Sequence, residues 1–118
     1  FPNAFFFGPS QSGFTATYTY SLDEQSIHLA HIISTAQEKG ATRIEASEKA
    51  EKEWVDIIIE KSRLTADFQE KCTPGYYNNE GQVNVKPQNN MYGGGPIEFF
   101  KLMKKWRSKG NLEGLELN

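Results

Sequence analysis

The chain opens on an almost unbroken apolar segment, residues 1–7 (FPNAFFF), which ends at Gly8 and Pro9. An apolar run without alternation predicts a strand buried on both faces, as in a parallel sheet. Such a strand needs neighbouring strands, and no other segment has this pattern. Val83 and Val85 alternate with polar residues before a proline, and residues 43–45 predict at most a short extended piece. We therefore expect an α/β fragment whose sheet lies largely outside this chain.

Helical spacing of apolar residues follows the opening segment. Ser21 and Glu24 fit a capping box, so the first helix is predicted to start there or a turn earlier, within residues 15–19. Lys39 and Gly40 provide its stop signal. Its predicted apolar face consists of Leu22, Leu29, Ala30, Ile33 and Ala36.

Two further helices are predicted downstream. One runs from Ser47, as N-cap, to about Arg63. The other begins with Pro96 at its first position and ends near Lys109 before a glycine. Its predicted buried face consists of Phe99, Leu102, Met103 and Trp106. Residues 72–95 between them read as a long loop, and loops of that length inside a domain are usually functional.

Composition narrows the possible partners. The chain has 118 residues, enough for one domain, with 13 Lys and Arg against 15 Asp and Glu. This balance indicates neither nucleic acid nor a membrane surface as a partner. No apolar run reaches the roughly 20 residues that a membrane span needs. The single cysteine, Cys72, cannot form an internal disulfide, so we expect a cytoplasmic protein.

Candidate chemistry is concentrated in two loops. The glycine-rich segment 8–13 (GPSQSG) lies between a predicted buried strand and a helix, where backbone can approach a ligand closely. It matches neither a dinucleotide fingerprint nor a Walker loop, and a flexible turn is the alternative. Tyr76 and Tyr77 in the long loop either stack on a ligand or anchor the loop. His28 and His31 have metal-ligand spacing but no third ligand, so we favour a structural role for them.

Five segments together resemble one family. They are FPNAFFFGPSQSG, SLDEQSIHLAHII, EKGATRIEASEKAEKEWV, CTPGYYNNEG and MYGGGPIEFFKLMKKW. In this order they resemble the C-terminal end of class I Baeyer–Villiger monooxygenases, in the branch of fungal and large-ring-ketone enzymes. The resemblance covers the whole chain, and TRIEASEKAEKEWV is its most specific part.

The resemblance implies a division of the chain and two cofactors, FAD and NADP. Residues 1–40 would be the terminal strand, loop and helix of the FAD-binding domain, and 41–71 a helical segment. Residues 72–95 would be a control loop that closes over the nicotinamide, and 96–118 the C-terminal helix and tail. The implied partners are the remainder of the parent enzyme and a ketone substrate. The whole would be a flavoprotein with two dinucleotide-binding domains of the Rossmann type.

The resemblance also implies site residues. The residues implied to contact FAD are Gly8, Pro9, Gln11, Ser12, and Tyr18 or Thr19, between which a length difference leaves the choice open. Tyr76 stands where the family has a tryptophan that contacts NADP, with Tyr77 beside it. No catalytic residue and no metal ligand is expected in this chain, because the family's catalytic arginine lies upstream.

Two other functions remain open on the sequence alone. One is a relative that oxygenates nitrogen or sulfur rather than ketones, which the loop and flavin wall cannot exclude. The other is a free-standing helical binding module without catalysis. A free-standing chain would have to bury residues 1–7 without a sheet, so their exposure distinguishes the two classes.

Overall fold

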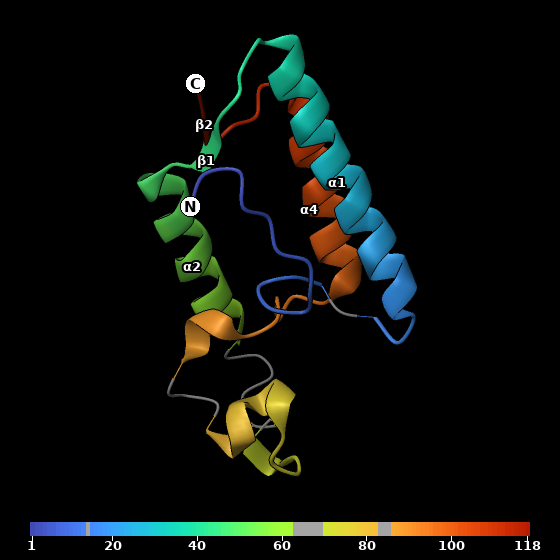
Figure 1. Cartoon of the computed structure of the whole chain (residues 1–118). Coiled ribbons are helices and arrows are strands. Elements are labelled where there is room, and N and C mark those ends of the chain that lie inside the picture. The colour runs from blue at the N-terminus through green and yellow to red at the C-terminus, as the bar shows by residue number, and fades with distance from the viewer. Residues whose placement is uncertain (14, 63–69, 83–85) are drawn as a thin grey trace.

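Two helices, α1 (Tyr18–Glu38) and α4 (Pro96–Lys109), lie side by side and run in the same direction (Figure 1). Three cross-helix contacts follow one another along both helices and establish the parallel arrangement. They are the ring contact of Tyr20 with Phe100, the ion pair of Glu24 with Lys104, and the ring contact of His28 with Trp106. The computed structural model describes residues 1–13, 15–62, 70–82 and 86–118.

The third helix, α2 (Glu48–Ser62), packs against the opposite side of α4. Ile58 of α2 is fully buried with Tyr92 and with the α4 residues Phe99, Phe100 and Met103. Trp54 stacks on the ring of Tyr92, with the ring centroids 5.8 Å apart. Among the described residues, α4 contributes Phe99, Phe100 and Met103 to this aromatic cluster and also packs against α1, so it lies between α1 and α2.

A small antiparallel sheet closes the end of the molecule where α1 and α4 finish (Figure 1). Its strands are β1 (Ile44–Ala46) and β2 (Leu115–Leu117), with Ile44 opposite Leu117 and Ala46 opposite Leu115. The second core lies beneath it and consists of buried Ile32, Ala36 and Leu112 with half-buried residues around them. The short extended piece predicted near residue 44 is thus a strand, but its partner in the C-terminal tail was not predicted.

Several predicted helix ends agree with the structure because they depend on local chemistry. The Ser47 hydroxyl accepts a hydrogen bond from the Ala50 N–H at 3.2 Å, as an N-cap should. Pro96 is the first residue of α4, and Gly110 follows it with φ of +67°, a conformation that favours glycine. Gly40, with φ of +72°, likewise follows α1. Arg63, the predicted end of the second helix, lies outside the described residues.

The start of α1 lies within the predicted range 15–19, but the predicted capping box and part of the predicted buried face are wrong. The helix begins at Tyr18, and neither Ser21 nor Glu24 caps it, because both side chains are buried on its inner face. That face turns toward α4 and also includes Ile32 and Ala36, whereas Ile33 is exposed. The apolar pattern had suggested a face rotated toward Leu22, Leu29 and Ile33. Within the described ranges, no helix is long and apolar enough to cross a membrane.

The opening aromatic segment, predicted as a strand buried on both faces, is not a strand in this structure. Residues 1–7 are all exposed, and the side chain of Phe6 is 94% exposed. Asn3 attaches the segment to the edge of the small sheet. Its N–H donates to the Ile44 carbonyl oxygen at 2.9 Å, and its Oδ1 accepts from the Ile44 N–H at 2.8 Å. The prediction fails in this chain because β1 and β2 provide no neighbour for residues 4–7.

The long loop is more structured than predicted. Residues 72–95 contain two 3₁₀ helices, η1 (Tyr76–Gly81) and η2 (Pro87–Asn89). The latter packs against α2. Val83 and Val85, which the alternation pattern singled out, lie outside the described residues.

The C-terminal end of this loop is anchored by Tyr92. Its hydroxyl donates a hydrogen bond to Glu98, whose carboxylate also receives Lys61 Nζ at 3.0 Å. Burial and the neighbouring Glu98 carboxylate raise the pKa of Tyr92 to about 12, so the phenol stays protonated as a donor. Loop, α2 and α4 are therefore joined at this point.

We expect Gly93→Ala to destabilise the protein that contains this chain. A methyl group at Gly93 would lie 2.0 Å from the backbone oxygen of Lys61, so the loop and α2 would have to separate. Overpacking of this kind costs about 1–3 kcal/mol. Gly75→Ala in the same loop is the matched control, because its nearest neighbour is 3.9 Å away. Thermal denaturation should show a lower midpoint for Gly93→Ala alone, and equal midpoints would contradict the assignment.

Candidate functional site

The glycine-rich loop, residues 8–13, packs against the side of α1. The sequence predicted that it would lead into the start of that helix. Instead, Gly8 is hydrogen-bonded in both directions to the side-chain amide of Gln25, which lies well inside α1. The Ser12 hydroxyl donates to the Gly8 carbonyl oxygen at 2.6 Å and closes the loop on itself. The loop is therefore a fixed turn held by α1.

The same loop is hydrogen-bonded to the end of the long loop. The Gln11 N–H donates to the Asn90 carbonyl oxygen at 2.9 Å, and Gln11 Nε2 donates to that of Gln88 at 2.8 Å. The Tyr92 N–H donates to the Ser12 carbonyl oxygen at 3.0 Å. The two loops that the sequence singled out are thus adjacent in space, although nearly eighty residues separate them.

The two end glycines of the loop have different surroundings. A methyl group at Gly13 would meet the ring of Phe99 at 2.8 Å, so this glycine is needed for packing against α4. At Gly8, no atom of the described residues other than its two chain neighbours lies within 4 Å of the position that a Cβ would occupy, and φ is +155°. One face of the Gly8 backbone is therefore open, as close approach by a ligand would require.

Other predicted cofactor residues are distributed around this turn. Pro9 and Gln11 are half-buried in it, and Ser12 is buried. Tyr18 and Thr19 form the first turn of α1 and are exposed, so both are accessible from solvent in this chain. The geometry does not choose between them.

Tyr76 and Tyr77 lie in η1, at the lower end of the molecule in Figure 1 and apart from the glycine-rich loop. The side chain of Tyr76 is 87% exposed. The alternative that Tyr76 anchors the loop to its own core is therefore wrong for this chain. An exposed aromatic ring at the tip of a loop is placed to contact another molecule or segment.

A buried charge cluster between α1 and α4 was missed by the sequence analysis. Glu24, only 6% exposed, has Lys104 Nζ at 3.4 Å from Oε1 and Arg107 Nη2 at 3.6 Å from Oε2. Its Oε2 accepts no hydrogen bond among the described residues, so it depends on this ion pair. Burial, helped by the Arg107 guanidinium, lowers the pKa of nearby His28 to about 4. The imidazole is consequently neutral near pH 7.

The two histidines do not form a metal site among the described residues, where no group of three potential ligands occurs. His28 and His31 both pack against the ring of Trp106 on α4. Their structural role, favoured from the sequence, is thus supported by their contacts.

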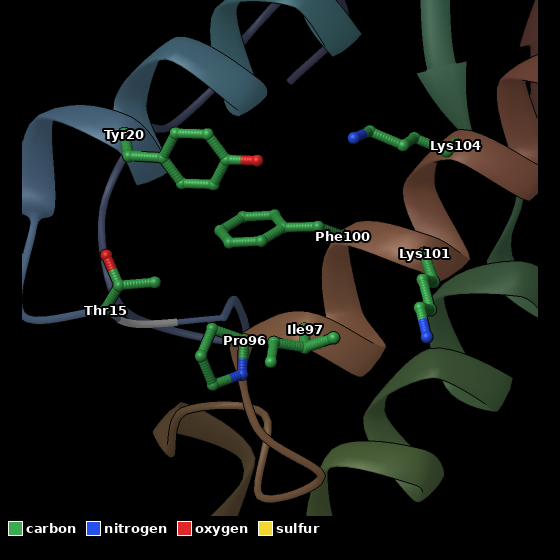
Figure 2. Close-up of a pocket in the computed structure, with 7 residues that line it drawn as sticks. All are labelled: Thr15, Tyr20, Pro96, Ile97, Phe100, Lys101 and Lys104. Atoms are coloured by element: carbon green, nitrogen blue, oxygen red, sulfur yellow. The ribbon is translucent and has the colours of Figure 1, made fainter.

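A hollow of about 230 Å³ lies between the starts of α1 and α4, as Figure 2 shows. The rings of Tyr20 and Phe100 line it and face each other in Figure 2, with their planes 88° apart. The residues that line it are Thr15, Tyr20, Pro96, Ile97, Phe100, Lys101 and Lys104. None of these is a predicted cofactor contact, so the hollow is separate from the glycine-rich loop.

Two residues that organise the site had a weak signal in the sequence. Glu24 and Gln25 are polar residues within one turn of the apolar positions Leu22 and Leu29. A polar side chain inside an apolar stripe has to find a partner when it is buried. That reasoning would have marked both positions, although it could not have named their partners on α4 and in the loop.

Comparison with known proteins relates the whole chain to one group of enzymes. Pentalenolactone D synthase of Streptomyces exfoliatus is 47% identical over 99% of this chain. A Baeyer–Villiger monooxygenase of Stachybotrys chlorohalonatus is 32% identical over 100% of it. The structure of the polycyclic ketone monooxygenase from the fungus Thermothelomyces thermophila superposes over the full chain with a TM-score of 0.87 and 29% identity. No family model matches the chain.

This chain spans about one fifth of the length of these relatives, and a further relative, 35% identical over 98% of the chain, is a FAD-binding monooxygenase of Hypomyces subiculosus. Along its full length, the chain corresponds to one segment of the Baeyer–Villiger monooxygenases. The resemblance inferred from the sequence motifs is confirmed. Fungal enzymes are among the relatives, as the resemblance implied, together with enzymes of Streptomyces.

We expect Glu24→Gln to loosen the contact of α1 with α4. The amide cannot balance the charges of Lys104 and Arg107, and breaking a buried pair is costly. Because Lys104 is half exposed, we expect a loss of about 1–3 kcal/mol. Hydrogen–deuterium exchange in the full-length protein should show faster exchange of α1 and α4 amides. Glu53→Gln, in an exposed pair with Lys49, is the control and should change little; equal effects would contradict the assignment.

Proposed function

We propose that this chain is the C-terminal part of a FAD- and NADPH-dependent Baeyer–Villiger monooxygenase. The reaction of the whole enzyme would convert a ketone, O₂, NADPH and a proton into an ester or lactone, water and NADP⁺. One oxygen atom enters the bond next to the carbonyl, and the other leaves as water. The similarity to named Baeyer–Villiger enzymes along the full chain supports this activity over oxygenation of nitrogen or sulfur.

The observation that carries the proposal is the junction of the glycine-rich loop with the end of the long loop. Gln11 and Ser12 are bound directly to residues 88–92 through three hydrogen bonds. A segment assigned to flavin contact and a segment assigned to nicotinamide contact are therefore coupled in one unit. Hydride transfer from NADPH to flavin requires the two cofactors to meet, so a shared support for both is expected.

FAD fits the open side of the glycine-rich loop. The free space beside the Gly8 Cα allows a planar ring or a phosphate to approach the backbone closely. In this proposal, Gly8, Pro9, Gln11 and Ser12 form a wall of the site. Tyr18 or Thr19 adds a contact from the first turn of α1, where the helix dipole favours an electron-rich group. FAD, when bound and reduced, supplies the activation of O₂, and these residues orient it and exclude water.

NADP would meet η1. Tyr76 offers an exposed aromatic face and a phenol, with Tyr77 next to it in the chain. Closure of η1 over the nicotinamide would order the loop and shield the reaction from water. The anchor at Tyr92 fixes the far end of the loop during this motion.

The exposed aromatic segment supports a partner within the same enzyme. Residues 1–7 expose several phenylalanine rings, which disfavours a free-standing helical module. We propose that this segment adds to the sheet of a FAD-binding domain of the Rossmann type in the remainder of the parent enzyme. The chain alone is not expected to hold FAD or to catalyse the reaction.

The activity is tested on the purified full-length protein. We expect flavin absorption bands, consumption of NADPH that depends on a cyclic or polycyclic ketone, and a product heavier than the ketone by one oxygen atom. With ¹⁸O₂, the label should appear in the ester or lactone. A colourless protein would refute the proposal. A yellow protein that oxidises amines or sulfides but no ketone would favour the other oxygenation chemistry.

A second test concerns Tyr76. Because an exposed ring that stacks on the nicotinamide contributes roughly 1–2 kcal/mol, Tyr76→Ala should raise the KM for NADPH about five- to thirty-fold. More of the oxygen consumed should also appear as hydrogen peroxide. The KM for the ketone, measured on the same variant, is the internal control and should change much less. If NADPH kinetics stay normal while substrate range shifts, Tyr76 belongs to the substrate pocket.

A further inference from the structure

The side-chain amide of Gln25 makes paired hydrogen bonds with one peptide backbone position. The Gly8 N–H donates to Gln25 Oε1 at 3.1 Å, and Gln25 Nε2 donates to the Gly8 carbonyl oxygen at 3.2 Å. Nε2 also lies 3.3 Å from the hydroxyl oxygen of Ser12. The orientation of the amide is determined, since its oxygen faces a donor and its nitrogen faces two acceptors.

This pairing falls at the point where the aromatic segment becomes the glycine-rich loop. Gly8 has an unusual φ of +155°, and the described residues provide no other partner for its N–H. Gln25 lies in the middle of α1, which the packing on α4 holds in place. The Gln25 amide therefore holds the irregular turn at Gly8 in a fixed position relative to α1.

The pairing also separates two sides of the Gly8 backbone. Its N–H donates to Gln25, and its carbonyl oxygen accepts from Gln25 and Ser12. On the side where a Cβ would lie, no described residue other than its chain neighbours comes within 4 Å. A ligand would therefore meet the open side and would not need to touch Gln25. This makes Gln25 a residue that acts through Gly8.

We propose that Gln25 is a positioning residue of the flavin site, which sets the Gly8 peptide at the angle that FAD requires. The inference rests on the proposed function, since it assumes that the glycine-rich loop contacts FAD. It adds a residue that makes no contact with the cofactor itself. Glutamine suits this role because a neutral amide supplies one acceptor and one donor on a side chain long enough to reach from the helix.

The test uses Gln25→Glu in the full-length enzyme. At pH 8 the carboxylate lacks a donor and faces the Gly8 carbonyl oxygen, so the turn should move. We expect the Kd for FAD, measured by titrating the apoenzyme, to rise roughly tenfold. The carbonyl oxygen disfavours the ionised form, so the pKa of the new carboxyl should lie above its ordinary value of about 4.3. As the pH falls toward 6, the carboxylic acid gains an O–H that can donate to Gly8, and FAD affinity should recover.

Gln37→Glu is the matched control. It makes the same change at an exposed position on the same helix, where the described contacts include no side-chain hydrogen bond. Its Kd for FAD should follow the wild-type enzyme at every pH. Gln25→Met, which keeps the length of the side chain without an amide, should weaken FAD binding at all pH values without recovery. If Gln25→Glu does not fold, the Kd for FAD of Gln25→Met tests the proposal instead.

The outcomes test the proposed function and the positioning role of Gln25 separately. If wild-type enzyme binds FAD but Gln25→Glu and Gln25→Met match Gln37→Glu in Kd throughout, the role of Gln25 is refuted and the proposed function stands. If the wild-type enzyme binds no FAD, the proposed function and this inference both fail. Weakened binding by Gln25→Glu that recovers at low pH supports the positioning role, because a general loss of stability would not be reversed by acid.

Discussion

Phe99 and Phe100 occupy the place where the glycine-rich loop, α1 and α2 meet on α4, and the arrangement of these parts depends on them. Phe99 contacts Tyr92 and Trp54 and leaves no room for a side chain at Gly13. Phe100 packs edge-on against Tyr20 at the start of α1. Aromatic pairs of this kind combine a large buried area with defined geometry. Adjacent rings on one helix thereby fix the relative position of segments from both ends of the chain.

Polar interactions then give this packing its specificity. The apolar contacts along α1 are few, and its inner face carries Ser21 and Glu24. Glu24 can be buried only where Lys104 and Arg107 lie, so sliding α1 by one turn along α4 would leave a buried charge unpaired. The cluster therefore sets the register of the two helices, and with it the height at which Gln25 meets the glycine-rich loop.

Features that depend on a few neighbouring residues could be predicted from the sequence. The start of α2 at Ser47 and the two ends of α4 follow from capping and from backbone preferences of proline and glycine. The glycine-rich loop and the aromatic pair at Tyr76 were recognised as candidates because of their composition. Their roles toward FAD and NADP stay predictions.

What could not be predicted depends on segments distant in sequence. The buried face of α1 is rotated from the apolar pattern because α4 offers cations opposite Glu24, while Ile33 is exposed. The pairing of β1 with β2 and the contact of Gln11 with Asn90 join residues about seventy to eighty positions apart. The aromatic segment shows the opposite case, since its pattern predicts a buried strand, whereas its residues are exposed and have no neighbour in the sheet of β1 and β2.

The attachment of Asn3 to β1 has a consequence for how a larger sheet could form. Asn3 holds one end of the aromatic segment through Ile44, and Gly8 holds the other end through α1. Residues 4–7 are consequently held at both ends, by Asn3 and by Gly8, without a neighbouring strand. Ordering a free strand costs about 1–2 kcal/mol of backbone entropy per residue, and a segment tethered at both ends has already lost part of that freedom. Residues 4–7 would therefore lose less entropy on pairing with a neighbouring strand than an untethered chain end would. We expect that pairing to be faster and to favour one register over others.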